Sequence, residues 1–378
     1  MRHPVAGKTV AGLSVTRHRK PEWAPAEGGK EFASRVMEAK SAGSKVSDAE
    51  AKKPSRGLPP VDSIAAGVLS GDRTLLAKAI TLIESNSPRH FEAGQELVRR
   101  LLPASGNSIR VGVTGVPGAG KSTFIESFGL WLIERGHKVA VLAVDPSSSL
   151  SRGSILGDKT RMEGLARHPS SFIRPSPSGG ALGGVTRKTR ETIIACEAAG
   201  YDIILIETVG VGQSEVTVRS MVDFFLLMQI AGAGDELQGI KKGIMELADL
   251  VVVNKADGNN IQAAELAGRE LNNALHYLRQ ATPGWTTKAL TCSAVQKTGL
   301  PEIWHEIERF VEKGKTSGVF EERRQSQVLQ WFESLLTEAV LNRFYSDPKI
   351  TKQLPRLRAA VQDGSLPVLL AVQELLAD

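Results

Sequence analysis

The chain has little of the chemistry that marks disulfide-linked or metal-binding domains. Its 378 residues include only two cysteines, Cys196 and Cys292, which lie far apart and form no C-x-x-C pair. This usage argues against a disulfide framework and a redox pair, and it indicates two buried thiols in a reducing compartment. The seven histidines have no metal-ligand spacing, so a zinc site is not expected.

Long hydrophobic runs are also missing. No apolar run approaches the roughly 20 residues that cross a membrane, so no membrane partner is expected. The net charge is +6, but residues 1–60 hold 12 of the 47 basic and only 6 of the 41 acidic residues, which leaves 35 of each in the rest. That neutral remainder does not interleave basic and aromatic residues, which argues against a nucleic-acid partner.

Residues 1–60 are rich in Lys, Ala, Gly, Ser and Pro, a composition that predicts disorder. The first 20 residues lack acids, which is typical either of an organellar transit segment or of a solvated bacterial tail. Weak amphipathic spacing and the early Glu22 favour the tail, and with it a cytoplasmic location. The alternative is the mitochondrial matrix.

Residues 61–104 have helical spacing and are expected to form an N-terminal helical cap on the nucleotide domain. Asp72 has the position of an N-cap residue, and Pro88 after Ser87 has the position of a first helical residue.

The most specific motif follows the apolar run 109–114. It reads G-x-x-x-x-G-K-S and consists of Gly115, Val116, Pro117, Gly118, Ala119, Gly120, Lys121 and Ser122, with Thr123 continuing into helical spacing. A phosphate-binding loop needs this setting, because glycines let backbone N–H groups surround phosphate oxygens at a helix N-terminus. Lys121 is predicted to reach the β- and γ-phosphates, and Ser122 to bind Mg²⁺. The motif therefore predicts binding of a nucleoside triphosphate.

Strand and helix patterns alternate across residues 105–314. Apolar runs end at or near Thr114, Asp145, Glu207, Gln229, Asn254 and Cys292. Continuous apolar runs separated by helices predict an α/β P-loop NTPase fold, with a mostly parallel sheet covered by helices on both faces. In such a sheet, ligands bind at the carboxyl ends of the strands.

A guanine-recognition motif follows one of these runs. Asn254, Lys255 and Asp257 form N-K-x-D, in which the aspartate accepts two N–H bonds from the guanine edge. Adenine offers no such donor pair, so the motif favours GTP over ATP. Ser293 and Ala294, at the end of the next run, have the position of the loop that supports the base.

Glu207 and Gly210 stand where many GTPases carry D-x-x-G. The carboxylate can hold Mg²⁺, and the glycine N–H can reach the γ-phosphate. Val211 occupies the place of the water-orienting glutamine of many small GTPases, so unaided hydrolysis is expected to be slow. Asp145 and Asp158 can complete the oxygen shell around Mg²⁺, or they can simply cap helices.

Two long glycine-bearing segments, 175–184 and 231–242, are expected beside the site. They are either surface loops or loops that convert the nucleotide state into a change of shape. Residues 315–378 are expected to be helical, because the apolar residues between Val328 and Phe344 recur at helical spacing. That helix either folds onto the domain or docks a partner subunit.

With these residues identified, the chain resembles the methylmalonyl-CoA mutase-associated GTPase family, a group of SIMIBI-class P-loop GTPases. The family includes bacterial proteins once described as arginine/ornithine transport kinases and the mitochondrial cobalamin type A protein. The resemblance covers the chain from about Val61 to its C-terminus. The strings that carry it are 115–123, 142–148, 153–162, 172–177, 206–215 and 234–241.

The resemblance implies a GTP-hydrolysing chaperone of an adenosylcobalamin-dependent methylmalonyl-CoA mutase or related acyl-CoA mutase. Such a protein uses GTP, GDP and Mg²⁺ to gate cofactor delivery and to release damaged cofactor, while adenosylcobalamin belongs to the mutase. It also implies a homodimer with 315–378 as a dimerisation arm. The implied metal-binding residues are Ser122, Asp145, Asp158 and Glu207, and the implied catalytic set is Lys121, Asp158, Glu207, Gln238 and Lys241. Of these, Gln238 and Lys241 would lie in a third switch loop that responds to the mutase.

Three other functions are compatible with the motifs. A nickel- or cobalt-insertion GTPase would share the fold, although His-rich or Cys-containing metal strings are missing from this sequence. A protein kinase of an amino-acid transport system is suggested by the older family description. A guanine-nucleotide sensor without catalytic activity would fit Val211.

Overall fold

The structure is a computed structural model, and it describes residues 59–144, 162–175, 182–208, 214–232 and 242–376. The predicted tail, 1–60, lies almost entirely outside them.

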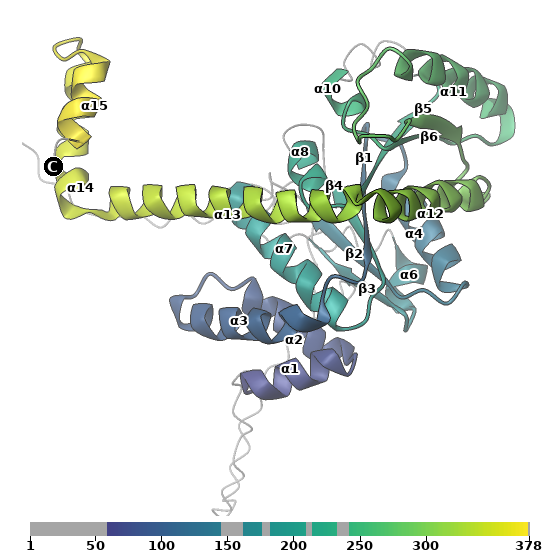
Figure 1. The fold of residues 1–378 in the computed structure, drawn as a ribbon, viewed down its shortest axis with the longest axis horizontal. Helices are drawn as coiled ribbons and strands as arrows, with labels where there is room; N and C mark the ends of the chain where they lie inside the picture. The colour runs from purple at the N-terminus through teal and green to yellow at the C-terminus, as the bar shows by residue number, and fades with distance from the viewer. Residues whose placement is uncertain (1–58, 145–161, 176–181, 209–213, 233–241, 377–378) are drawn as a thin grey trace, which may run out of the picture. The chain divides into compact units, whose positions relative to one another are not determined.

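Seven parallel strands form one sheet in the order β3-β2-β4-β1-β5-β6-β7. Figure 1 shows this sheet among the helices. The predicted parallel α/β sheet is therefore confirmed. The strands are β1 (Ile109–Gly115), β2 (Val139–Val144), β3 (Ser171–Arg174), β4 (Ile203–Thr208), β5 (Phe224–Ile230), β6 (Leu250–Asn254) and β7 (Lys288–Thr291). The apolar runs did not predict β3, which is a short edge strand of four residues that begins with serine and ends with arginine.

Helices cover both faces of this sheet. On one face, the side chains of β1, β5 and β6 pack with those of α4 (Lys121–Ile133) and α12 (Leu300–Ser317) in one apolar cluster. On the other face lie α7 (Leu182–Ala198), α8 (Ser214–Arg219), α10 (Lys242–Met245) and α11 (Ile261–Leu275). The shorter elements are η1 (Leu102–Ala104), α6 (Glu163–Arg167) and η2 (Gly258–Asn260). Fully buried strands explain why the sequence reads as apolar runs and not as alternation.

Three N-terminal helices, α1 (Val61–Leu69), α2 (Arg73–Ile83) and α3 (Pro88–Leu101), pack beside α7 and share its apolar cluster. The predicted N-cap is confirmed, because Asp72 Oδ1 accepts hydrogen bonds from the N–H groups of Thr74 (2.7 Å) and Leu75 (2.9 Å). Pro88 is the first residue of α3, also as predicted.

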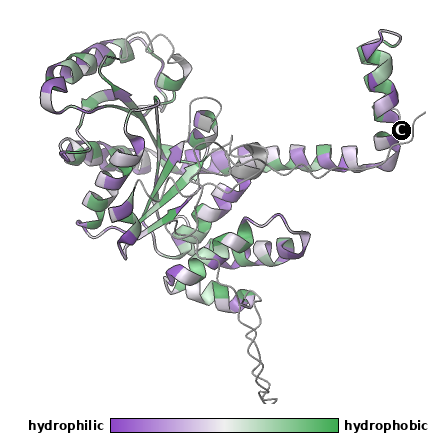
Figure 2. Cartoon of the chain, turned by 180° about the vertical axis from the view of Figure 1, so that it is seen from behind, coloured by the Kyte–Doolittle hydropathy of each residue, from purple (hydrophilic) through white to green (hydrophobic). Residues whose placement is uncertain are grey.

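The C-terminal part begins with α13 (Val319–Ser346), followed by α14 (Pro348–Gln362) and α15 (Val368–Leu376). A single residue, Gly318 (φ 78°), both ends α12 and precedes α13. Beyond Gln327 the apolar side chains of α13 are largely exposed, and Figure 2 shows hydrophobic residues recurring along this stretch. No helix in the described ranges has both the length and the hydropathy of a membrane span.

Arg324 anchors α13 to the sheet. Its guanidinium donates to both carboxylate oxygens of Asp223 (Nε to Oδ1 2.7 Å, Nη2 to Oδ2 2.6 Å) and to the carbonyls of Ser108 and Gly106. Asp223 is buried and also accepts from the Arg110 N–H (2.9 Å). The first turns of the helix are therefore fixed to the end of the sheet at which β1 and β5 begin.

We expect Arg324→Ala to lower the free energy of unfolding by about 3–5 kcal/mol, because it leaves a buried carboxylate without its guanidinium partner and removes the donor of two carbonyls. Arg356→Ala is the matched control, since Arg356 pairs with Glu374 where both side chains are exposed, and should cost less than about 1 kcal/mol. Urea unfolding followed by circular dichroism measures both. Equal losses for the two variants would contradict this account of the anchor.

Candidate functional site

The loop between β1 and α4 has the backbone of a phosphate-binding loop. Gly115 (φ 153°) ends the strand, and a Cβ there would lie 2.3 Å from the Met228 carbonyl oxygen. Gly120 (φ 82°) precedes the helix, and its Cβ would lie 2.8 Å from Asn254 Nδ2. Both positions need glycine, because the turn uses left-handed backbone and passes close to β5 and β6.

Lys121 begins α4 and folds back over this loop. Its Nζ donates to the carbonyls of Gly115 (2.9 Å) and Val116 (3.3 Å). Burial lowers the pKa of the ammonium, and the carboxylates of Glu207 and Glu215 oppose that shift. A buried cation at the mouth of a glycine loop and at a helix N-terminus is suited to bind phosphate.

The Mg²⁺ prediction is supported by Ser122 and Glu207. Ser122 is in the first turn of α4, and its Oγ donates to Glu207 Oε1 at 3.0 Å. Glu207 is almost fully buried near the end of β4, and the next residue, Thr208, donates to Thr114 Oγ1 (2.9 Å) on β1. A serine hydroxyl beside a carboxylate supplies the hard oxygen ligands that Mg²⁺ prefers, so these residues fit the metal.

Asn254, at the end of β6, joins the phosphate loop to the predicted base loop. Its Nδ2 donates to the Ala119 carbonyl at 2.7 Å, and its Oδ1 accepts from the Ala294 N–H at 3.1 Å. The Cys292 thiol lies 3.4 Å from the same oxygen, and burial raises its pKa to about 12, so it remains protonated. The side chain of Asn254 is therefore fully engaged in holding two loops together.

The side chains of Asp257 and Ser293 contact each other. The Ser293 hydroxyl donates to Asp257 Oδ2 and accepts from the Gln296 N–H at 3.1 Å. Lys255 takes a left-handed conformation (φ 61°), and its carbonyl accepts from Asn260 Nδ2 at 2.7 Å. These contacts fix the Asp257 carboxylate against Ser293, which is compatible with its predicted role in recognising guanine.

The structure thus brings together the phosphate-loop residues with Glu207, Asn254, Asp257, Ser293 and Ala294. Five other predicted site residues lie outside the described part of the chain: Asp145, Asp158, Gly210, Gln238 and Lys241. Their roles stay predictions.

Sequence reasoning missed two contributors. Glu215 in α8 is buried and its charge acts on Lys121. Thr114 supports β4 beside the metal-site carboxylate through Thr208. In the sequence, only their positions could have indicated these two residues: Thr114 directly precedes the phosphate loop, and Glu215 follows the segment that begins at Glu207.

The comparisons with known proteins identify the family of this chain. A family model described as methylmalonyl Co-A mutase-associated GTPase MeaB matches residues 76–349. A probable GTPase of Mycobacterium tuberculosis is 55% identical over 316 residues, which cover 84% of this chain and 94% of the relative. The mitochondrial methylmalonic aciduria type A homolog of Mus musculus is 48% identical over 316 residues, covering 81% and 76%.

Among solved structures, a crystal structure described as an LAO/AO transport system kinase superposes with a TM-score of 0.68. It is 42% identical and covers 83% of this chain and 96% of its own. The phosphate loop, Glu207, Asn254 and Asp257 all fall within the range that the family model matches.

We expect Asp257→Asn to lower the preference for GTP over ATP by about 10- to 100-fold, because the amide replaces one acceptor by a donor facing the guanine N–H groups. Competition between the two nucleotides for the purified protein measures this preference. Lys121→Ala is the contrasting variant and should weaken both nucleotides alike, since it removes a charge that faces only phosphate. An unchanged preference in Asp257→Asn would refute the base assignment.

Proposed function

The chain belongs to the methylmalonyl-CoA mutase-associated GTPase family, and on this premise we propose that it hydrolyses GTP as a chaperone of an adenosylcobalamin-dependent mutase. In this role GTP gates the delivery of the cofactor and protects or reactivates the mutase. The observation that carries the proposal is the family match over 76–349, which spans both the nucleotide-binding residues and the first part of the C-terminal helices. The name of the family links such GTPases to methylmalonyl-CoA mutase.

In the proposed mechanism the chain's residues bind and orient the nucleotide. The backbone of the phosphate loop and Lys121 surround the phosphates, and Asp257 with Ser293 selects guanine. Ser122 and Glu207 would hold Mg²⁺, with Asp145 and Asp158 proposed to complete its ligands. When bound, the metal offsets the negative charge of the phosphate oxygens.

Stimulation by the partner follows from the missing water-orienting side chain. The side chain of Val211 is aliphatic and can neither donate nor accept a hydrogen bond, whatever the position of its backbone. We therefore propose slow hydrolysis by the protein alone and faster hydrolysis on the mutase. Gln238 and Lys241 are the proposed responders.

We also propose that the protein is a homodimer formed through its C-terminal helices. Exposed apolar side chains recur on α13 at Val328, Leu329, Phe332, Leu336, Val340 and Leu341, and on α15 at Val368, Leu369, Leu370, Val372 and Leu376. An apolar surface of this extent on helices is typical of a subunit interface.

Protein phosphorylation is the weaker alternative, although a related crystal structure carries the description of a transport kinase. The Asn254–Asp257 geometry supports guanine, and no residue described here favours transfer of phosphate to a protein over transfer to water.

Adding a purified adenosylcobalamin-dependent methylmalonyl-CoA mutase should raise the rate of phosphate release at least tenfold, because the partner supplies what Val211 does not. Released phosphate is measured with GTP and Mg²⁺, with the mutase alone as the control. A rate that no such mutase changes would count against the chaperone role. Transfer of the γ-phosphate of GTP to a protein, without release of free phosphate, would favour the kinase.

The dimer proposal predicts that Phe332→Glu converts the protein to a monomer, since a charge in an apolar interface is unpaired. Ser334→Glu is the matched control, because it adds the same charge about 200° around the same helix. Sedimentation velocity measures both masses. A monomeric wild-type protein would refute the proposal.

A further inference from the structure

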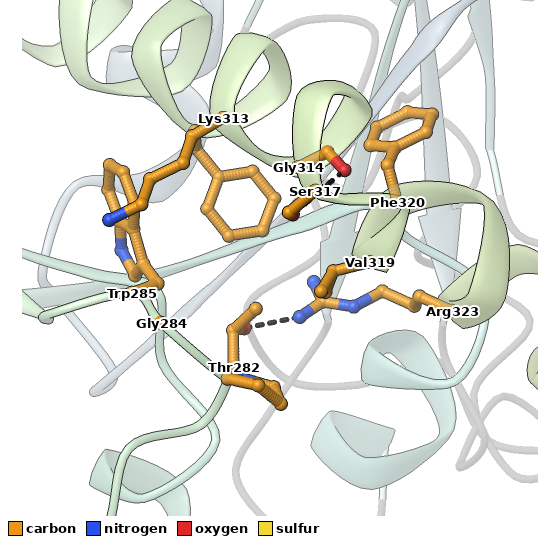
Figure 3. A pocket seen from close by; sticks show the side chains of 11 residues that line it. Thr282, Gly284, Trp285, Lys313, Gly314, Ser317, Val319, Phe320 and Arg323 are labelled. Atoms are coloured by element: carbon orange, nitrogen blue, oxygen red, sulfur yellow. Dashed lines mark hydrogen bonds between the residues drawn. The ribbon is translucent and has the colours of Figure 1, made fainter.

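Two adjoining cavities lie along the base of α13. The first has a volume of about 280 Å³ and opens between the segment 282–285, the end of α12 and the start of α13, as Figure 3 shows. The second, of about 410 Å³, lies between α8 and the next two turns of α13. Both are lined by Pro283, Val319 and Arg323, so they adjoin each other, and we call the pair the α8–α13 groove.

One end of the groove is apolar. Trp285, Phe310 and Phe320 line it, and the rings of Trp285 and Phe310 meet edge to face with centroids 5.0 Å apart. The three side chains are buried in the core cluster, so their positions are fixed by packing. A rigid aromatic hollow of this size accepts one apolar side chain.

The rest of the groove carries an excess of positive charge. Arg219 and Arg323 line it, and both lie against one buried carboxylate, that of Asp249, at 3.2 and 3.5 Å. The neighbouring Asp223 is already engaged by Arg324 through two hydrogen bonds. Arg219 and Arg323 therefore share one carboxylate beneath the groove, whereas Arg324 has Asp223 and is also affected by the charges of Glu197 and Glu321.

This excess is only partly relieved inside the protein. Arg219 Nη1 is buried and makes no hydrogen bond, although it lies near Asp249 Oδ2. Lys313 adds a further cation to the lining, and Glu322 is the one acid among the lining residues of the two cavities. A carboxylate brought by a partner would balance charge that is costly to leave unpaired at low exposure.

The groove lies at the end of the sheet where β5 and β6 begin, opposite the predicted nucleotide site, and it adjoins α8 and α13. On one side is α8, whose Glu215 acts electrostatically on Lys121. On the other is α13, whose Gln327 Nε2 donates to the carbonyls of Val222 (2.8 Å) and Arg219 (3.3 Å), just after α8. A partner bound between these helices would contact both the helix that carries Glu215 and the base of α13.

We propose that the α8–α13 groove is a docking surface for the partner mutase, receiving an apolar side chain flanked by acidic residues. The proposal rests on the proposed function, because that function supplies the partner. The aromatic hollow selects the apolar side chain, and the shared guanidinium groups select the acids.

The test measures the affinity of purified mutase for three variants by biolayer interferometry in the presence of a non-hydrolysable GTP analogue. Lys313→Glu reverses a charge at the rim, and Ser317→Trp places a bulky side chain in the hollow. Lys349→Glu makes the same charge change on α14, away from the groove, and is the control. We expect Kd to rise at least tenfold for the first two and to stay within about twofold for the control. Melting temperatures verify that all variants fold, and Lys313→Glu alters only an exposed side chain.

The possible outcomes separate this proposal from the one it rests on. Wild-type affinity in both Lys313→Glu and Ser317→Trp overturns the docking surface while leaving the chaperone role intact. A wild-type protein that binds no mutase overturns both. If sedimentation shows that the two variants lose self-association, the groove accepts a second copy of this chain, and the mutase assignment is wrong.

Discussion

The hydrogen bond from Asn254 Nδ2 to the Ala119 carbonyl is the contact on which the site depends. It joins the glycine loop before α4 to the strand end that precedes Asp257, so it fixes the two halves of the proposed nucleotide site relative to each other. The space for this bond exists because Gly120 has no side chain. The proposed recognition of GTP therefore depends on contacts between the two motifs at this edge of the sheet, and not on each motif separately.

Much of this edge could be predicted from the sequence, because its determinants are local. A glycine loop between an apolar strand and a helix, and an N-K-x-D string after another apolar strand, specify both backbone and chemistry within a few residues. The same holds for the Asp72 cap. The sequence did not reveal β3, whose four residues include only two apolar ones. Nor did it reveal the Arg324–Asp223 anchor, because those residues are 101 positions apart and pair only through the tertiary fold.

The sequence also left open whether the helix predicted between Val328 and Phe344 folds onto the domain or docks a partner subunit. Helical spacing of apolar residues predicts one buried face, but it does not say what buries it. In α13 the residues up to Gln327 contact the sheet domain, whereas Phe332, Leu336 and Val340 remain exposed. The same periodic pattern thus serves two surfaces, one within the chain and one available to another molecule.

The anchoring of α13 has a mechanical consequence. Its attachments at Arg323, Arg324 and Gln327 span about 6 Å of helix, whereas the stretch beyond Gln327 extends about 28 Å at 1.5 Å per residue. A rigid rod held at one end behaves as a lever, so a tilt that displaces the attachments by about 1 Å relative to each other would carry the far end through about 5 Å. Small shifts of the Arg323 and Arg324 side chains would therefore produce larger displacements of α14 and α15.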